Sequence, residues 1–144
     1  AAVNGVVDYF ESVAAHHARN DEESVAAQAR LVRTLFHHAE SALLPPLLDF
    51  LSAHPRVRLI GSAQPVDRAP TVAFTVEGLS SVEVAQALAR LDIGVGHGNF
   101  YAYRLMQALG IDPAEGVVRA SFVHYTSGAD VDRLIAGLKS TLDS

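Results

Sequence analysis

The first third of the chain carries apolar residues at the spacing of amphipathic helices. A first helix is predicted from residue 1 to about Ala18, because one apolar stripe recurs every three or four positions: Val3, Val6, Val7, Phe10, Val13 and Ala14. Asn20 can cap a second helix, with Glu23 three positions on as in a capping box. This helix should continue to about Leu44, and its inward residues are expected to be Val25, Ala29, Val32, Leu35 and Phe36. Pro45-Pro46 should end or kink it before a short helical piece over 47–53.

The rest of the chain mixes strand and helix patterns. Strands are predicted over Val57–Ile60, Thr71–Val76 and Val117–Val123, with a short extended segment over 93–98. In the last strand Val118, Ala120 and Phe122 share one face, which we take as the core side, and the residues on the other face are Val117, Arg119, Ser121 and Val123.

Two capping boxes predict helix starts in the same region. Ser80 with Glu83 and Ser127 with Asp130 have the required spacing, and the helix after Ser127 should bury Val131, Leu134, Ile135, Leu138 and Leu142. A further helix is predicted over 100–109, stopped by Gly110 and Pro113. The order is not a regular alternation of strand and helix. We therefore expect an α+β fold: a small, mainly antiparallel sheet with helices packed on one face, preceded by long helices.

Composition narrows the classes of protein to consider. The chain has 144 residues, 49% hydrophobic and 19% charged, which suits one compact domain or one domain plus a fragment. A net charge of -5 with scattered arginines argues against nucleic-acid binding, and no apolar run approaches the ~20 residues of a membrane span. The absence of cysteine excludes thiol catalysis and fits a cytoplasmic protein. A helix under way at residue 1 leads us to expect a piece of a longer protein.

Arg119 is the candidate binding residue that stands out from the strand patterns. A guanidinium on a short apolar strand is costly unless it has an anionic partner, and it can bind a carboxylate through two parallel hydrogen bonds. The partner could equally be a structural Asp or Glu, or the side chain could be solvated.

Other motifs point less clearly to chemistry. Gly94, Gly96 and Gly98 precede a helix, but Asn99 stands where a dinucleotide-binding loop needs its third glycine. The loop therefore suits either a tight turn or close approach to a ligand. Seven histidines are present without the spacing of a metal site, so no metal is expected. No G-x-S-x-G motif supports a serine hydrolase.

One segment resembles a known family. The C-terminal signature of class V aminotransferases and cysteine desulfurases reads roughly V-R-x-S-x-x-x-Y-N-T-x-x-E-[IV]-D-x-L. This chain has a similar segment, VVRASFVHYTSGADVDRLIAGL, with Thr126 in place of the usual Asn. RAPTVAFTVEG and the helix and glycine loop after it resemble the middle segment of that family, and AAVNGVVDYFESV resembles the helix that closes its large domain.

The resemblance implies a pyridoxal 5'-phosphate (PLP) enzyme of fold type I, an aminotransferase or desulfurase-like transferase or lyase. Residues 1–19 would close the large cofactor-binding domain, and residues 20–144 would form the C-terminal small domain. Arg119 matches the arginine that binds the substrate carboxylate, and the resemblance places His97, Asn99 and Tyr101 on the loop beside it. Tyr101 stands where desulfurases carry their loop cysteine and cannot form a persulfide.

The resemblance also implies partners outside this chain. The family uses a Schiff-base lysine, whereas the single lysine here, Lys139, lies on the last predicted helix at a position that no family motif makes catalytic. We therefore expect no catalytic residue in this chain, no turnover by the chain alone, and PLP bound only in an intact enzyme. The expected partners are a large N-terminal domain, an amino-acid substrate and a second subunit covering Val6, Val7 and Phe10 in a homodimer. The alternative is a stand-alone α+β module that binds a small carboxylate or a protein.

Overall fold

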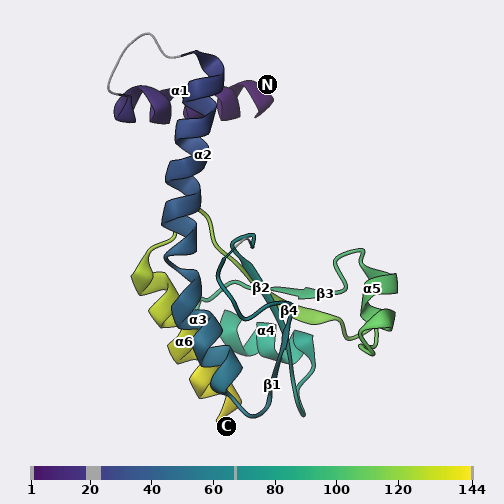
Figure 1. Cartoon of the computed structure of the whole chain (residues 1–144). Coiled ribbons are helices and arrows are strands. Elements are labelled where there is room, and N and C mark those ends of the chain that lie inside the picture. The colour runs from purple at the N-terminus through teal and green to yellow at the C-terminus, as the bar shows by residue number, and fades with distance from the viewer. Residues whose placement is uncertain (1, 19–23, 67, 144) are drawn as a thin grey trace. The chain divides into compact units, whose positions relative to one another are not determined.

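The computed structural model describes residues 2–18, 24–66 and 68–143, which form two compact units that divide between Ala39 and Glu40. The first unit contains helix α1 (Ala2–His17) and nearly all of helix α2 (Val25–Ser41). The second contains a four-stranded sheet and the remaining helices (Figure 1). Within the described ranges, no helix is both long enough and apolar enough to cross a membrane. This division comes from contacts within the chain and does not test the predicted boundary between a large-domain helix (residues 1–19) and a small domain (residues 20–144). That boundary stays a prediction.

The two-helix unit buries less than its sequence pattern predicts. Phe36 of α2 lies against Phe10 of α1, with ring centroids 5.4 Å apart, and Ala14 and Val32 are buried. Val25 and Ala29 are exposed, so the prediction that they face inward is wrong. The reason is geometric: a helix that packs against one other helix buries only the narrow stripe in contact. The predicted cap at Asn20 and Glu23 lies outside the described residues.

The proline pair begins a helix instead of interrupting one. Helix α2 ends at Ser41, earlier than predicted, and α3 runs from Leu44 to Ala53 with the prolines in its first turn. Proline is tolerated there because the first amides of a helix have no partner within the helix. The short helical piece predicted over 47–53 is therefore part of a longer helix, which buries Leu44, Leu47, Leu48 and Leu51.

The sheet is antiparallel throughout, with strand order β1-β2-β4-β3. Its strands are β1 (Val57–Ile60), β2 (Thr71–Val76), β3 (Gly96–Gly98) and β4 (Val117–Ser121). Strand β4 is hydrogen-bonded to β2 on one side and to β3 on the other. The predicted fold class, α+β with a small antiparallel sheet, is confirmed.

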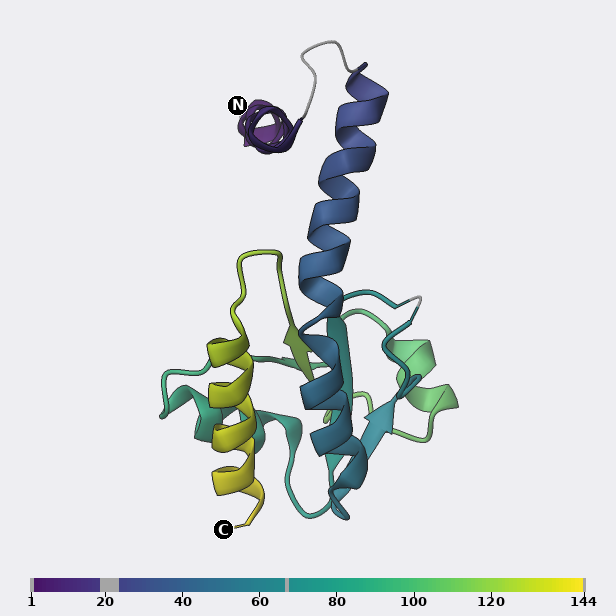
Figure 2. The same cartoon turned by 60° about the vertical axis from the view of Figure 1, so that its left-hand side comes forward.

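Three helices cover one face of this sheet. Helices α3, α4 (Ser81–Ala89) and α6 (Gly128–Leu142) pack on the face that carries Val72, Phe74, Val118 and Ala120. Helices α3 and α6 run side by side over it (Figure 2). Each fully buried side chain of this cluster contributes roughly 1.5–3 kcal/mol relative to exposure. This core determines which face of the sheet remains for other contacts.

The opposite face is covered over one part only. Met106 of α5 (Tyr103–Ala108) forms a second, smaller cluster with Ile111 and Val117, and Ile60 and Ala73 of the neighbouring strands pack against it. Arg119 and Ser121, on the same face as Val117, are exposed. Helix packing is therefore uneven: three helices on one face, and a short α5 on part of the other.

Element ends near β3 and β4 differ from the predictions. The helix predicted over 100–109 begins only at Tyr103, because Phe100 and Tyr101 adopt left-handed backbone angles with φ of 51° and 62°. Strand β4 ends at Ser121, and Val123–Thr126 form a turn in which the Thr126 amide donates to the Val123 carbonyl. Strand β3 has three residues, fewer than the extended segment predicted over 93–98.

Both predicted capping boxes are confirmed. At α6 the Ser127 hydroxyl and amide donate to the Asp130 carboxylate at 2.7 and 2.9 Å, and the Asp130 amide donates back to the hydroxyl at 3.2 Å. The hydroxyl bond, then the amide bond, lowers the pKa of Asp130 below its ordinary value. Ser80 lowers the pKa of Glu83 in the same way at α4.

Replacing Ser127 should make the free energy of unfolding less dependent on pH in acid. Because the folded-state pKa of Asp130 is depressed, its stabilising effect is present above the unfolded-state pKa and is lost as pH falls through the folded-state pKa. The wild type should therefore lose stability below about pH 4 more steeply than Ser127→Ala. Urea unfolding at a series of acid pH values measures this loss of stability. The control is Ser140→Ala, at an exposed position of the same helix. Equal slopes in the wild type and Ser127→Ala would contradict the pairing.

Gly116 should tolerate no side chain. Its φ is 63°, and a Cβ there would lie 2.1 Å from the Gly98 carbonyl carbon. Gly110 has a similar φ of 69° but open space around it, so Gly110→Ala isolates the backbone strain. We expect about 1–2 kcal/mol of destabilisation for Gly110→Ala. Gly116→Ala should lose a further ~1–3 kcal/mol for the clash. Urea unfolding of both variants tests this, and equal losses would exclude the close contact.

Candidate functional site

Arg119 lies at the centre of the partly covered face of the sheet. Its strand neighbours are Ala73 on β2 and Gly96 on β3. Both neighbours have small or absent side chains, so they leave room above the strand for the long arginine side chain. Arg119 is exposed, and its backbone lies in a strand that is hydrogen-bonded on both sides.

Arg119 differs from the other strand arginine and from those in the loops beside the sheet. Arg58 donates to the Leu109 carbonyl at 2.8 Å, and Arg68 donates to the Thr71 carbonyl at 2.8 Å. Arg56 donates to the carbonyls of Glu77 and Leu142. Across the described ranges, the Arg119 guanidinium has no hydrogen-bond or ion-pair partner. A structural carboxylate partner, one of the alternatives from the sequence, is thus absent from the described part of the chain, and the donors of Arg119 are open to a ligand.

The contact that Arg119 does make is with an aromatic ring. Its Cζ lies 3.9 Å from the centroid of the Phe100 ring, a stacking distance for a cation–π interaction. Gly96 makes room for this ring, because a Cβ at Gly96 would lie 3.0 Å from the Phe100 Cζ. Phe100 also packs against the Met106 cluster, which further limits the movement of the ring.

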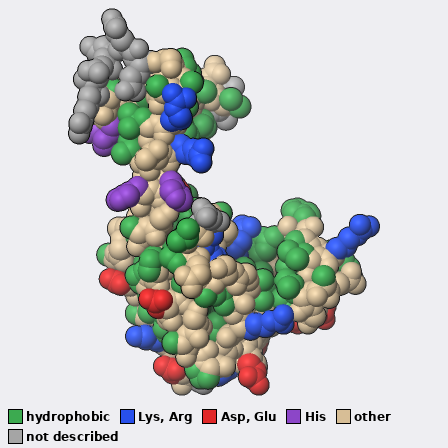
Figure 3. Space-filling view, in the orientation of Figure 1, with side chains coloured by type: hydrophobic (Ala, Val, Ile, Leu, Met, Phe, Trp, Pro, Cys, Tyr) green, Lys and Arg blue, Asp and Glu red, His purple; other side chains and the backbone are tan. Residues whose placement is uncertain are grey.

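A short loop presents Phe100 and Tyr101 in opposite environments. The Asn99 side chain donates through Nδ2 to the Pro113 carbonyl at 3.0 Å and accepts from the Tyr101 amide at 3.1 Å. These bonds support the left-handed backbone of the next two residues, which is unfavourable for side chains other than glycine. Phe100 is half-buried, whereas the Tyr101 side chain is 104% exposed. Apolar side chains gather around this loop and α5 (Figure 3).

The structure brings together only some of the predicted site residues. His97 is the register partner of Val118, and paired residues of a ladder share a face, so His97 lies on the core side of the sheet, opposite Arg119. Asn99 supports the loop internally, and Tyr101 projects from it. Phe100 was not among the predicted site residues. Its contact with Arg119 depends on the left-handed backbone of Phe100 and Tyr101, which the sequence does not predict because neither residue is a glycine.

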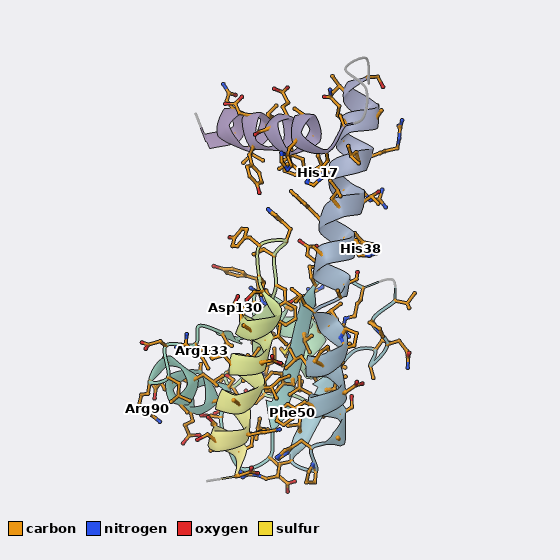
Figure 4. The ribbon with its side chains drawn as sticks, turned by 90° about the vertical axis from the view of Figure 1, so that its left-hand side faces the viewer. His17, His38, Phe50, Arg90, Asp130 and Arg133 are labelled. Carbon is orange, nitrogen blue, oxygen red and sulfur yellow. The ribbon has the colours of Figure 1, made fainter. Side chains whose placement is uncertain are left out.

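A cavity of about 280 Å³ adjoins the strand that carries Arg119. Its lining includes Ser121, Tyr125, Thr126, Asp130 and Arg133. Asp130 and Arg133 belong to the first turns of α6, as Figure 4 shows. The cavity therefore lies between residues 92–95 and the turn that connects β4 to the last helix, which belongs to the segment with the family resemblance.

Comparison with known proteins assigns the family. The family model for class V aminotransferases matches residues 10–134. An aminotransferase-like protein of Gibberella zeae is 37% identical over 107 residues, which cover 72% of this chain and 26% of that protein. A cysteine desulfurase of Pectobacterium atrosepticum is 32% identical over 100 residues, 69% of this chain and 23% of the relative. The solved structure of a Thermococcus onnurineus cysteine desulfurase superposes with a TM-score of 0.71 at 28% identity and covers 82% of this chain and 30% of its own.

The chain therefore belongs to the class V aminotransferase and cysteine desulfurase-like family. It spans about a quarter of the length of the two curated relatives named above. The family is generally PLP-dependent.

The residues of this chain do not by themselves fit PLP. The cofactor needs a lysine for its Schiff base. The single lysine, Lys139, lies on α6, and its Nζ is 5.8 Å from the ring centroid of Phe50 on α3, which Figure 4 labels. Both helices pack on the core face, on the other side of the sheet from Arg119. The described residues contain no group of three or more His, Asp or Glu that could hold a metal ion. Two of the histidines, His17 and His38, lie on separate helices, α1 and α2 (Figure 4).

Asn99 should control the order of the loop. Asn99→Ala removes both side-chain bonds, so the Tyr101 amide should exchange its hydrogen faster by an order of magnitude or more, and stability should fall by about 1–2 kcal/mol. Asn99→Asp keeps the acceptor for the Tyr101 amide and loses the donor to Pro113, so it should protect this amide better than Asn99→Ala. Hydrogen exchange followed by NMR distinguishes the two. Equal protection of Tyr101 in the wild type and Asn99→Ala would show that the backbone holds the turn unaided.

Proposed function

We propose that this chain is the C-terminal small domain of a PLP-dependent class V enzyme, and that Arg119 binds the α-carboxylate of its amino-acid substrate. In this proposal residues 20–144 close the active site, and residues 1–19 belong to the large cofactor-binding domain. The observation that carries the proposal is an exposed arginine on the middle of a sheet face, which has no hydrogen-bond or ion-pair partner among the described residues. Family membership and the relatives' greater length support it.

The chemistry of the guanidinium suits this role. Its planar fork can donate two parallel hydrogen bonds to a carboxylate. An exposed ion pair contributes only about 0–1 kcal/mol, whereas hydrogen bonds to charged groups shielded from water contribute about 1.5–3 kcal/mol. The chain alone should therefore bind a carboxylate weakly, and closure by a second domain should strengthen the interaction.

The loop residues have secondary roles in the proposal. Tyr101 borders the substrate site from an exposed position, and Asn99 holds the loop. His97, on the opposite face of the sheet from Arg119, has no direct contact with the substrate in this proposal. Tyr101 has no thiol, so a persulfide cannot form there, and we propose a reaction other than cysteine desulfuration by that route. The Schiff-base lysine comes from the large domain. The intact enzyme is proposed to be a cytoplasmic homodimer, in which a second subunit covers Val6, Val7 and Phe10.

Arg119→Lys should remove the two-pronged donor while keeping the charge. We expect the wild-type chain to bind L-alanine in the millimolar range or more weakly, with the Arg119 Nε–Hε signal shifting in NMR titrations. Arg119→Lys should bind at least about fivefold more weakly, because lysine cannot make the second of the two charge-assisted hydrogen bonds. Arg90→Lys, at the exposed end of α4, is the matched control and should bind like the wild type. Equal binding by Arg119→Lys and the wild type would count against the role of Arg119.

The domain assignment has its own test, on the same chain joined to the cofactor-binding domain of a class V relative. The joined protein should show the visible absorbance band of bound PLP, and Arg119→Lys should raise KM for the amino acid while leaving this band unchanged. A joined protein that folds but binds no PLP would favour the stand-alone carboxylate-binding module instead.

A further inference from the structure

Phe100 has a position that the proposed carboxylate site does not by itself require. Its ring lies over Arg119, yet it stands on a loop with two successive left-handed residues, each of which costs free energy. The surrounding contacts hold this costly geometry in place: the two Asn99 bonds, the absent side chain of Gly96 and the Met106 cluster. Such a concentration of constraints around one ring calls for an explanation.

Stacking and carboxylate binding use different parts of the guanidinium. The Arg119 Cζ lies over the ring, 3.9 Å from its centroid, a separation short enough for the ring to stack on the face of the planar group. All five N–H bonds lie in the plane, so they stay available at the edge. A carboxylate needs this edge and does not compete with the ring. The ring covers one face and restricts rotation of the side chain, so a bound carboxylate would lose less arginine conformational entropy.

We propose that Phe100 is a positioning residue that holds the Arg119 guanidinium by stacking, so that its edge is pre-oriented for the substrate carboxylate. The inference rests on the proposed function, since it explains how the carboxylate site is prepared. Gly96 belongs to the same device, because its missing side chain lets the ring reach the arginine. The pre-oriented edge selects ligands with a planar, two-oxygen anion.

Two kinds of variant test the device on the full 144-residue chain. Gly96→Ala leaves Phe100 and Arg119 unchanged but places a methyl group 3.0 Å from the Phe100 Cζ, so the ring must shift by a few tenths of an ångström. Gly128→Ala is the matched control, because the same substitution there meets open space. Phe100→Leu removes the aromatic face, and Phe100→Tyr restores it.

Two measurements are made on each ¹⁵N-labelled variant: the order of the Arg119 side chain from its Nε–Hε heteronuclear NOE, and the affinity for L-alanine. In the wild type, Arg119 should be more ordered than exposed Arg90. In Phe100→Leu it should become as mobile as Arg90, and the affinity should fall about two- to fivefold. Gly96→Ala, which only displaces the ring, should change both quantities in the same direction by less. Gly128→Ala and Phe100→Tyr should match the wild type in both measurements. A purely structural role of Phe100 would lower the melting temperature without changing the order of Arg119.

The outcomes separate this inference from the proposed function. If Arg119→Lys abolishes binding while Phe100→Leu and Gly96→Ala bind like the wild type, the carboxylate site stands and the positioning role is overturned. The positioning role is also overturned if Arg119 is as mobile as Arg90 in the wild type. If Arg119→Lys binds like the wild type, both proposals fail.

Discussion

Pairing of β4 on both of its edges is the constraint from which the site geometry follows. A strand hydrogen-bonded to two neighbours cannot turn about its axis, so its alternating side chains are fixed to their faces. Val118 and Ala120 enter the main core, and Arg119 is therefore directed to the opposite face. Slippage by one residue would place a charged guanidinium in the core and is excluded by its desolvation cost. The large cluster under α3, α4 and α6 thus orients an arginine that lies on the opposite face of the sheet.

The small second cluster determines what stands beside the arginine. Helix α5 covers one part of the face, and the loop before it carries Phe100 to the guanidinium. Arg56, Arg58 and Arg68 donate to backbone carbonyls instead, and the bond from Arg58 to Leu109 joins the end of α5 to β1. Arg56, Arg58 and Arg68 thus use their guanidinium groups to hold the fold, whereas no hydrogen bond or ion pair of Arg119 is found among the described residues.

Local patterns in the sequence predicted much of this arrangement. Both capping boxes form because their bonds join residues three positions apart, and the strand alternation correctly placed Arg119 opposite the core. Prediction failed where distant contacts decide. The left-handed turn at Phe100 and Tyr101 depends on Pro113, and the exposure of Val25 depends on how little of α2 its partner helix covers. The stacking of Phe100 on Arg119 requires the pairing of Gly96 with β4, which no local pattern encodes.

The contact between Gly98 and Gly116 has a consequence for how this family can vary. It joins the two ends of the connection between β3 and β4, directly beside the Gly98–Val117 pair, and the bond from Asn99 to Pro113 ties the same ends a second time. The intervening residues therefore start and finish at one point on the sheet, with their apolar underside resting on Ile60 and Ala73. A segment closed in this way can change in sequence or length around Tyr101 without moving the strand that carries Arg119.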